Sequence, residues 1–353
     1  MLRFEQSIQS KYTLRNYKSQ IERFLKFTKL KDYDSLVNVP KEDIQMLVEE
    51  YAVHLTNTIN ANSVQTMMTG VKHFFIMNKI PLYWEFIQKM YPKKVKRSGF
   101  LPWTTEHIRK MLNATTSERT KAIIHFMAST GSRVGIHDYD LSMKHLKNLE
   151  DDCKAVLIYA GEIDEYWAFL TPEASEALEL YFSKRQSDGE IFSEDSPIFR
   201  IEYNGLGFGN AKPVKKSSVA CLIWRIIKKA GIDRKRINRN FDIQQDHGFR
   251  KRFNTIMKLN SEINSNIAEK ILGHSVTHKL DNTYFTPSVD DLFKEFKKGI
   301  PELTISETYR LRLENESKEK EIQELQSDKK RIAQLERNMA NIIELIEHSQ
   351  KKD

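Results

Sequence analysis

DHGFRKRFN, residues 246–254, places His247 and Arg250 three positions apart on an expected helix, and DNTYFTPS, residues 281–288, follows with Tyr284 in a polar loop. Residues three apart on a helix share one face, so the imidazole and the guanidinium would project together. A His-x-x-Arg pair often arises by chance, however, and an exposed tyrosine is common on protein surfaces. The remainder of the chain has to show whether these residues form one site.

The composition is that of a basic globular chain with room for more than one domain. The chain has 353 residues and a formal net charge of +8, and 40% of its residues are hydrophobic. Domains hold roughly 100–200 residues, so two domains and a tail are expected. The positive charge favours a polyanionic partner, although an ordinary basic surface would look the same.

Cysteine usage and hydropathy predict where the chain works. Cys153 and Cys221 form no CxxC pair and no zinc-type spacing with histidine, which is typical of a reduced intracellular protein. The first residues lack the apolar core of a signal peptide, and no apolar run approaches the roughly 18 residues of a membrane span. We therefore expect a cytoplasmic protein with no membrane contact.

Helical periodicity predicts an amino-terminal domain over residues 1–90. Apolar residues recur at helical spacing in three stripes, the first of which follows Thr13, a candidate N-cap. The members are Tyr17, Ile21, Phe24 and Leu25; Ile44, Leu47, Val48, Tyr51 and Leu55; and Val64, Met67, Met68, Val71, Phe74 and Phe75. The stretch YPKKVKRSGFLPW (91–103) is rich in proline and positive charge, so residues 91–102 are predicted to be a basic linker.

Residues 103–300 are predicted to form a second, mainly helical domain. The helical pattern is interrupted by CKAVLIYAGEIDEYWAFLT (153–171). This stretch contains two β-rich runs around Gly161, which predict a hairpin. The loop NGLGFGNAKPVKK (204–216) matches neither glycine-rich phosphate-binding pattern and is expected to be a plain loop. The predicted fold class is therefore mainly α with a small antiparallel β-hairpin or sheet.

Residues 301–353 are rich in Glu, Lys, Gln and Leu, and this composition predicts a helical tail. Its apolar residues stand at mixed spacings of seven, three and four: Leu325, Ile332, Leu335, Met339, Ile342 and Ile346. This pattern indicates a long amphipathic helix, or a short coiled coil whose phase slips near residue 333.

The second domain contains the groups that phosphodiester transfer needs. Two negative phosphate oxygens must be neutralised, which suits the forked guanidinium of arginine, and protons must be moved. Arg133 lies in MASTGSRVGIHDYDLSMKHL (127–146), and His274 lies in KILGHS (270–275). Taken alone, Arg133 is an ordinary surface arginine and His274 an ordinary helix-end histidine. Tyr284 could attack if the surrounding positive field made its phenolate accessible.

Together, the order and spacing of these residues resemble the tyrosine recombinase (phage integrase) family. That family has an arginine after a TG turn, HxxR, LGH about two dozen residues later, and a tyrosine nine or ten residues further. The resemblance extends into the amino-terminal half, covers about residues 10–296, and implies a helical core-binding domain followed by a mixed catalytic domain. The lysine-rich style and helical tail look most like archaeal mobile-element integrases.

The resemblance implies the following roles. Tyr284 would attack the scissile phosphate, Arg133 and Arg250 would clamp its oxygens, His247 would assist proton transfer, and His274 would hydrogen-bond the phosphate. The covalent link conserves the bond energy, so no cofactor or metal is expected. The implied partner is double-stranded DNA, bound by a homo-tetramer on paired recombination sites, with no small-molecule substrate. A linker between two DNA-facing domains would contact phosphates.

Two positions depart from the family pattern. The family has an acidic residue three positions after the first arginine, whereas this chain has Ile136, with Asp138 two positions further. The family's leaving-group lysine lies in the hairpin, but the turn here has the sequence AGEIDEY, and the nearest candidate is Lys154 at the hairpin's foot. The identity of the proton donor is left open by the sequence.

Two alternative functions share part of this pattern. A type IB topoisomerase uses the same nucleophile and clamp but relaxes DNA without site preference. A degenerate integrase would only bind DNA. We also expect the helix in SVDDLFKEFKKGI (288–300) to dock Leu292, Phe293 and Phe296 on a neighbouring protomer, the alternative being packing within its own domain.

Overall fold

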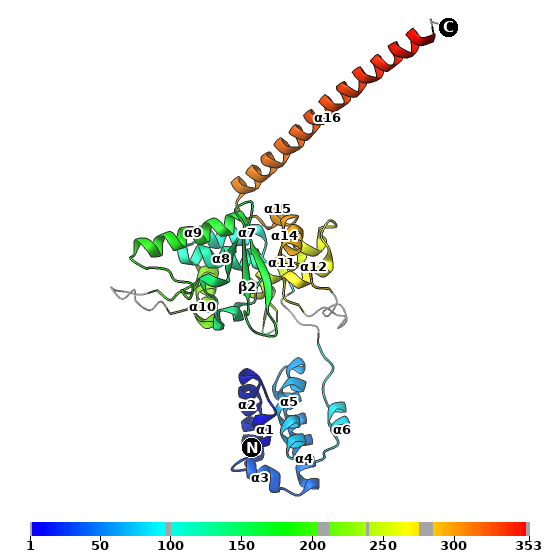
Figure 1. Cartoon of the computed structure of the whole chain (residues 1–353). Helices are drawn as coiled ribbons and strands as arrows, with labels where there is room; N and C mark the ends of the chain where they lie inside the picture. The colour runs from blue at the N-terminus through cyan, green and yellow to red at the C-terminus, as the bar shows by residue number, and fades with distance from the viewer. Residues whose placement is uncertain (1, 96–99, 203–211, 238–239, 275–284, 351–353) are drawn as a thin grey trace. The chain divides into compact units, whose positions relative to one another are not determined.

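The structure is a computed structural model that describes residues 2–95, 100–202, 212–237, 240–274 and 285–350 (Figure 1). Its contacts divide the chain into two units, Met1–Arg97 and Ser98–Asp353. Among the described residues, the first unit has one hydrophobic core and the second has two.

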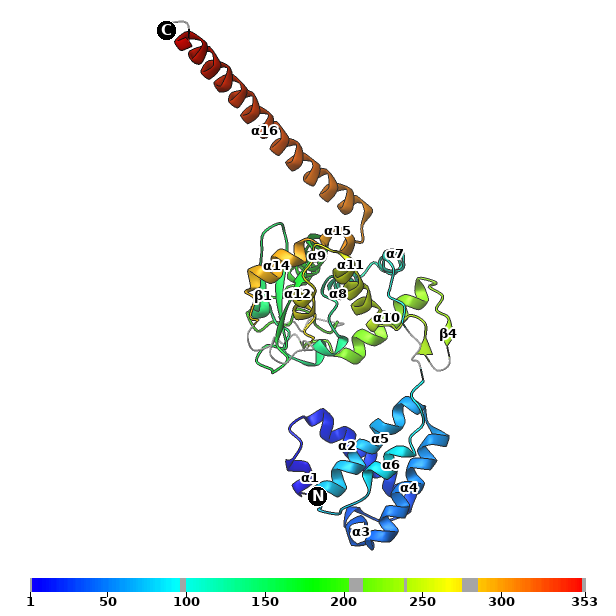
Figure 2. The ribbon, with the colours of Figure 1, turned by 90° about the vertical axis from the view of Figure 1, so that its right-hand side faces the viewer.

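The first unit is a small bundle in which α2 (Lys11–Thr28) packs against α5 (Ala61–Met77). Its other helices are α1 (Leu2–Gln6), α3 (Tyr33–Asn38), α4 (Lys41–Thr58) and α6 (Trp84–Lys89) (Figure 2). The three predicted stripes supply the core. The N-cap of α2 is Ser10, whose hydroxyl accepts a hydrogen bond from the Thr13 amide at 3.4 Å, so the predicted Thr13 cap was wrong.

Gly70 explains why α2 and α5 approach so closely. A Cβ atom at residue 70 would lie 2.9 Å from the Cα atom of Tyr17, which real contacts do not allow. The amide of Gly70 donates to the buried Gln20 side chain at 2.7 Å. The glycine therefore permits backbone contact, and the glutamine satisfies a donor that the contact exposes.

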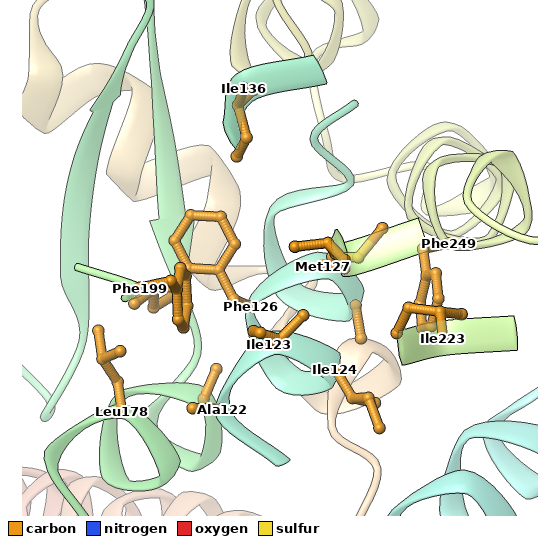
Figure 3. Close-up of a cluster of buried hydrophobic side chains, with 14 of the residues drawn as sticks. Ala122, Ile123, Ile124, Phe126, Met127, Ile136, Leu178, Phe199, Ile223 and Phe249 are labelled. Carbon is orange, nitrogen blue, oxygen red and sulfur yellow. The ribbon is translucent and has the colours of Figure 1, made fainter. Parts of the chain in front are cut away.

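The second unit is built around α8 (Glu118–Thr130), a helix buried on every side from Ala122 to Thr130. Figure 3 shows Ile123, Phe126 and Met127 of α8 among side chains from the surrounding elements. The other helices of this part are α7 (Thr105–Asn113), η1 (Val134–Asp138), η2 (Met143–His145), α9 (Pro172–Ser187), α10 (Lys216–Lys229) and α11 (His247–Leu259). Phe126 meets Phe199 edge-on, with ring centroids 5.2 Å apart.

The sheet is three-stranded and antiparallel, in the order β1 (Leu146–Asn148), β2 (Lys154–Ile158) and β3 (Tyr166–Leu170). Lys154 pairs with Leu170 at one end of the hairpin, and Ile158 pairs with Tyr166 at the other. The predicted hairpin around Gly161 is confirmed. A separate short ribbon joins β4 (Arg236–Ile237) to β5 (Asn240–Phe241).

A second core lies on the other side of β3 and covers the apolar face of α14 (Val289–Lys297). Phe296 is fully buried, with its ring centroid 5.3 Å from that of Phe169 and 6.3 Å from that of Phe253. Leu292 and Phe293 are also buried there, beside α12 (Ser265–Ile271). The expectation that α14 docks these side chains on a neighbouring protomer is therefore wrong, because other elements of the second unit cover them.

The chain ends in α15 (Ile300–Leu303) and the single long helix α16 (Glu307–Gln350). In the part of the chain that the structure describes, every helix is too short or too polar to span a lipid bilayer. Most of the predicted loop at 204–216 lies outside the described residues.

Candidate active site

Arg250 is the buried centre of the site and ties together the ends of two helices. Its Nη1 donates to the carbonyl oxygen of Gly131, the C-cap of α8, at 2.9 Å, and its Nη2 donates to the carbonyl oxygen of Leu272, the C-cap of α12, at 2.6 Å. Carbonyls at helix C-termini lack intrahelical donors and carry partial negative charge, so a guanidinium suits them. Burial lowers the pKa of Arg250, and the nearby charge of Arg133 lowers it further.

Arg133 comes from the turn that ends α8. Gly131 adopts a left-handed φ of +58°, and a Cβ atom there would lie 2.7 Å from the Cβ atom of Phe253. Only glycine therefore fits this turn between α8 and α11. Arg133 follows it as the exposed N-cap residue of η1. Thus the TG turn directs the chain so that Arg133 faces solvent within electrostatic range of Arg250.

His247 is the first residue of α11, one turn before Arg250, and its side chain is partly exposed to solvent. Partial burial lowers its pKa, as do the positive charges of Lys251, Arg250 and Arg133, while Asp246 opposes them. Since the ordinary histidine value is about 6.5, the imidazole is mainly neutral at pH 7. A neutral imidazole can accept a proton.

His274 is held at the end of α12 by a carboxylate. Its Nδ1 is hydrogen-bonded to Glu269, which is also paired with Lys258, and its backbone amide donates to the Glu269 carbonyl at 3.0 Å. The preceding Gly273 has a φ of +60°, and a Cβ atom there would lie 2.3 Å from the Tyr166 ring. This arrangement orients the imidazole through Nδ1 and leaves Nε2 for a ligand.

His274 belongs to the same electrostatic group as the other three residues. Burial is the main cause that lowers its pKa; Arg250 and Arg133 lower it further, and Glu269 raises it. The structure therefore brings Arg133, His247, Arg250 and His274 together, although α11 and η1 are far apart in the sequence. Tyr284 lies outside the described residues, so its predicted place remains a prediction. Its neighbour Phe285 is described and packs against the second core.

Tyrosines next to the two arginines were missed by the sequence reasoning. Tyr159, at the end of β2, is half-buried and has a φ of +57°, which a tyrosine rarely adopts. Its ring centroid lies 4.7 Å from that of Tyr139 and 6.2 Å from that of Tyr166. Burial raises the pKa of Tyr159, and Arg133 is the chief influence that lowers it.

Tyr166 is buried close to Arg250 and Tyr159. Burial raises its pKa to about 12, although the adjacent Arg250 acts in the opposite direction. Both tyrosines therefore carry their phenolic protons at neutral pH. The only sequence signal was position: both flank the hairpin turn, where the family pattern would place a proton donor.

Lys154 lies away from this group. Its Nζ contacts Glu179 at 2.7 Å and Asn148 at 2.6 Å, at the end of β2 opposite to Tyr159. A strand rises about 3.3 Å per residue, so the five residues of β2 separate these ends by roughly 13 Å. Lys154 lines a different cavity, of about 850 Å³, between the sheet, α9 and Tyr309.

The missing acidic residue after the first arginine also has a structural explanation. Ile136 is buried in the main core, with 2% of its surface exposed, so its position faces inward. Asp138 instead accepts a hydrogen bond from the Lys216 amide at 3.1 Å and pairs with its ammonium group at 3.1 Å. It therefore anchors the first turn of α10. Within the described ranges, no group of three or more His, Cys, Asp or Glu residues could hold a metal ion.

Comparison with known proteins gives one family match and a set of similar folds. The model of the phage integrase family matches residues 103–289. No curated protein matches the sequence. The fold is similar to a lambda integrase(75–356) dimer bound to a COC' core site, at 17% identity and a TM-score of 0.51, over 78% of this chain and 89% of that one.

Two further solved structures share the fold. The XerH site-specific recombinase bound to difH substrate has 16% identity and a TM-score of 0.52, over 78% of this chain and 79% of that one. A lambda integrase tetramer bound to a Holliday junction has 16% identity and a TM-score of 0.51, over 81% and 78% of the two chains.

Proposed function

Because this chain belongs to the phage integrase family, it is a tyrosine-type site-specific DNA recombinase, and we propose that Tyr284 is its nucleophile. The observation that carries the proposal is the position of Arg250. Its buried guanidinium is fixed between two helix ends, while Arg133, His247 and His274 surround it. A preorganised positive group of this kind stabilises the charge that builds on a phosphate during displacement.

The proposed step exchanges one phosphodiester bond for another. The Tyr284 hydroxyl oxygen attacks phosphorus, and its proton passes to neutral His247. The bond from phosphorus to the 5′ oxygen breaks, which leaves a 3′-phosphotyrosyl link. Arg133 and Arg250 neutralise the non-bridging oxygens, and His274 hydrogen-bonds the same phosphate through Nε2. Reversal of the step with a different 5′ hydroxyl rejoins the DNA without a cofactor or a metal.

The leaving 5′ oxygen must also receive a proton. Lys154 is badly placed for this role, because it is paired with Glu179 at the far end of β2. Tyr159 is protonated at neutral pH and lies in the field of Arg133 and Arg250, which would stabilise its phenolate. We therefore favour Tyr159 as the proton donor.

The proposed biological reaction is integration or excision of a mobile element. One of the similar structures is a lambda integrase tetramer on a Holliday junction, and by analogy this chain would act as a homo-tetramer on two paired duplex sites. The reaction would take place in the cytoplasm of a cell without a nucleus, where the DNA lies.

A covalent-trapping experiment tests the nucleophile. The full chain is incubated with a pool of nicked duplexes of random sequence, in which the cleaved end diffuses away, and DNA that remains attached after denaturation is collected. Wild type should yield a covalent adduct, whereas Tyr284→Phe should yield none and still bind DNA within a few-fold of wild type. The control is Tyr83→Phe, a change at an exposed tyrosine of the first unit. An adduct with Tyr284→Phe would contradict the assignment. Sequence-independent relaxation of a supercoiled plasmid would instead favour a topoisomerase.

A further inference from the structure

The long helix α16 presents a row of apolar side chains that nothing in the described chain covers. Every described side chain from Arg310 to Met339 is exposed. Six of these are large and apolar, with exposed fractions between 51% and 63%: Leu311, Ile322, Leu325, Ile332, Leu335 and Met339. Single exposed hydrophobic residues are ordinary, but a regular row along one helix is a different feature.

The row follows a seven-residue repeat. Leu325, Ile332 and Met339 stand seven residues apart, and the repeat continues in the sequence to Ile346; Leu311 has the same phase, but Lys318 occupies the position between it and Leu325. Ile332 and Met339 occupy a positions of this heptad. Leu335 and Ile342, three residues later in each case, occupy the d positions. This register keeps one phase through residue 333, so the phase slip expected there was wrong. Before Leu335 the d positions are Glu314, Glu321 and Asp328, so the apolar seam begins at Leu325 and is interrupted once, at Asp328.

A repeat of seven, shorter than two ideal helical turns, keeps an apolar seam facing a neighbouring helix only if the two helices supercoil. Ile at a and Leu at d, as at Ile332 and Leu335, favour two parallel strands. The seam from Leu325 to Ile346 covers 22 residues, or roughly 30 Å of helix. That length is enough for several heptads of contact.

The charges that flank the seam identify the partner as a second copy. In the sequence, Glu324 and Arg331 occupy g positions, while Lys329 and Glu336 occupy e positions. In a parallel, in-register pair, each g residue meets the e residue five positions later on the other chain. The pairs would be Glu324 with Lys329 and Arg331 with Glu336, so every charge meets its opposite. The cost is Asp328, which would face its own copy at d.

The first turn of α16 is fixed to the catalytic unit. The Glu173 carboxylate of α9 accepts hydrogen bonds from the amides of Ile305 and Ser306 at 2.8 and 2.9 Å, and Tyr309 is hydrogen-bonded to Glu176. A partner bound along α16 would therefore be tethered to the catalytic unit. From the exposed row, its repeat and its flanking charges, we propose that α16 pairs with α16 of a second copy as a parallel, in-register coiled coil that forms without DNA.

The oligomeric state of the full chain, measured by light scattering without DNA, tests the pairing. Wild type should be a dimer. The double variant Ile332→Lys, Leu335→Lys places two charges on the seam and should be monomeric. The matched control Ala333→Lys, Gln334→Lys adds the same charges beside the seam and should remain a dimer. Both variants should keep the wild-type melting temperature of the catalytic unit, because the side chains at residues 332–335 are exposed.

A cysteine cross-link tests the orientation. Leu325→Cys is made in a Cys221→Ser background, since Cys221 is exposed and Cys153 is buried. A parallel pair brings the two copies of residue 325 together, so mild oxidation should give a disulfide-linked dimer on a denaturing gel. An antiparallel pair would separate them and give no link. A monomeric wild type, a dimer that survives the seam variant, or a dimer without the link would each overturn the proposal. None of these readouts depends on Tyr284, so the proposed chemistry can fail separately.

Discussion

Arg250 donates a hydrogen bond from Nη1 to the carbonyl oxygen of Gly131, 119 residues earlier in the chain, at 2.9 Å. The same guanidinium bonds Leu272, so one side chain joins the TG turn, the HxxR helix and the LGH turn. Arg133 is exposed and takes no part in these two hydrogen bonds. The two proposed clamp arginines therefore differ: Arg250 also supports the fold, whereas Arg133 is exposed to solvent.

That difference predicts unlike effects of alanine substitution. Arg250→Ala and Arg133→Ala should each slow adduct formation by roughly 100- to 1000-fold, because each removes one preorganised donor. Only Arg250→Ala should also lower the melting temperature, since it leaves two buried helix-end carbonyls without a donor. Adduct kinetics and thermal unfolding of both variants check this. Equal melting temperatures would show that the ties of Arg250 do not stabilise the fold.

The chemistry of the leaving group can show whether Tyr159 or Lys154 donates the proton to the 5′ oxygen. A substrate with a bridging sulfur in place of the 5′ oxygen departs without a proton. Tyr159→Phe should slow cleavage of ordinary DNA by about 100-fold or more and be rescued by the sulfur substrate. Lys154→Ala should cleave both substrates at nearly the wild-type rate. Rescue of Lys154→Ala instead would return the role to the lysine. Tyr284→Phe should not be rescued.

The pH dependence of cleavage should report His247. If the neutral imidazole accepts the Tyr284 proton, activity falls as pH drops through its pKa, which lies below the ordinary 6.5 because of burial and positive neighbours. Asp246 raises this pKa, so Asp246→Asn should move the acid limb to lower pH. Lys251 lowers it, so Lys251→Ala should move the limb to higher pH. Shifts in the same direction in the two variants would exclude His247 as the titrating group.

Packing of α14 predicts a loss of stability at Phe296. Phe296→Ala should reduce the free energy of unfolding by about 3–5 kcal/mol, because the ring is fully buried against Phe169 and Phe253. Phe86→Ala, at an exposed position of the first unit, should change it by less than about 0.5 kcal/mol. Urea unfolding measures both. An intact fold in Phe296→Ala with loss of assembly would instead support docking on a neighbour.

The basic linker predicts a salt effect on DNA binding. Lys93, Lys94, Lys96 and Arg97 lie within five residues of sequence in the predicted linker, at the end of the first unit. Neutralising all four should reduce the slope of log affinity against log salt by about 0.9 for each DNA phosphate that the protein no longer neutralises. Binding titrations at several salt concentrations check this. An unchanged slope would place the linker outside the DNA interface.

Local patterns determined much of the secondary structure and part of the site. Helical periodicity placed the three apolar stripes of the first unit, and the β-rich runs around Gly161 placed the hairpin, because both depend on spacings of a few residues. The spacing of His247 and Arg250 also put them on one helix. The cap of α2 was misplaced at Thr13, since Ser10 is an equally good capping residue three positions earlier.

Only the tertiary structure decided which distant residues meet. The apolar face of α14 required a cover, but the sequence could not say whether its own domain or a neighbour supplied it; Phe169 and Phe253 do so. No sequence pattern connected Tyr159 with Arg133, or Lys154 with Glu179. Hydrophobic patterning specifies which side of an element is buried, whereas partners far apart in the chain are chosen by the packing of the whole domain.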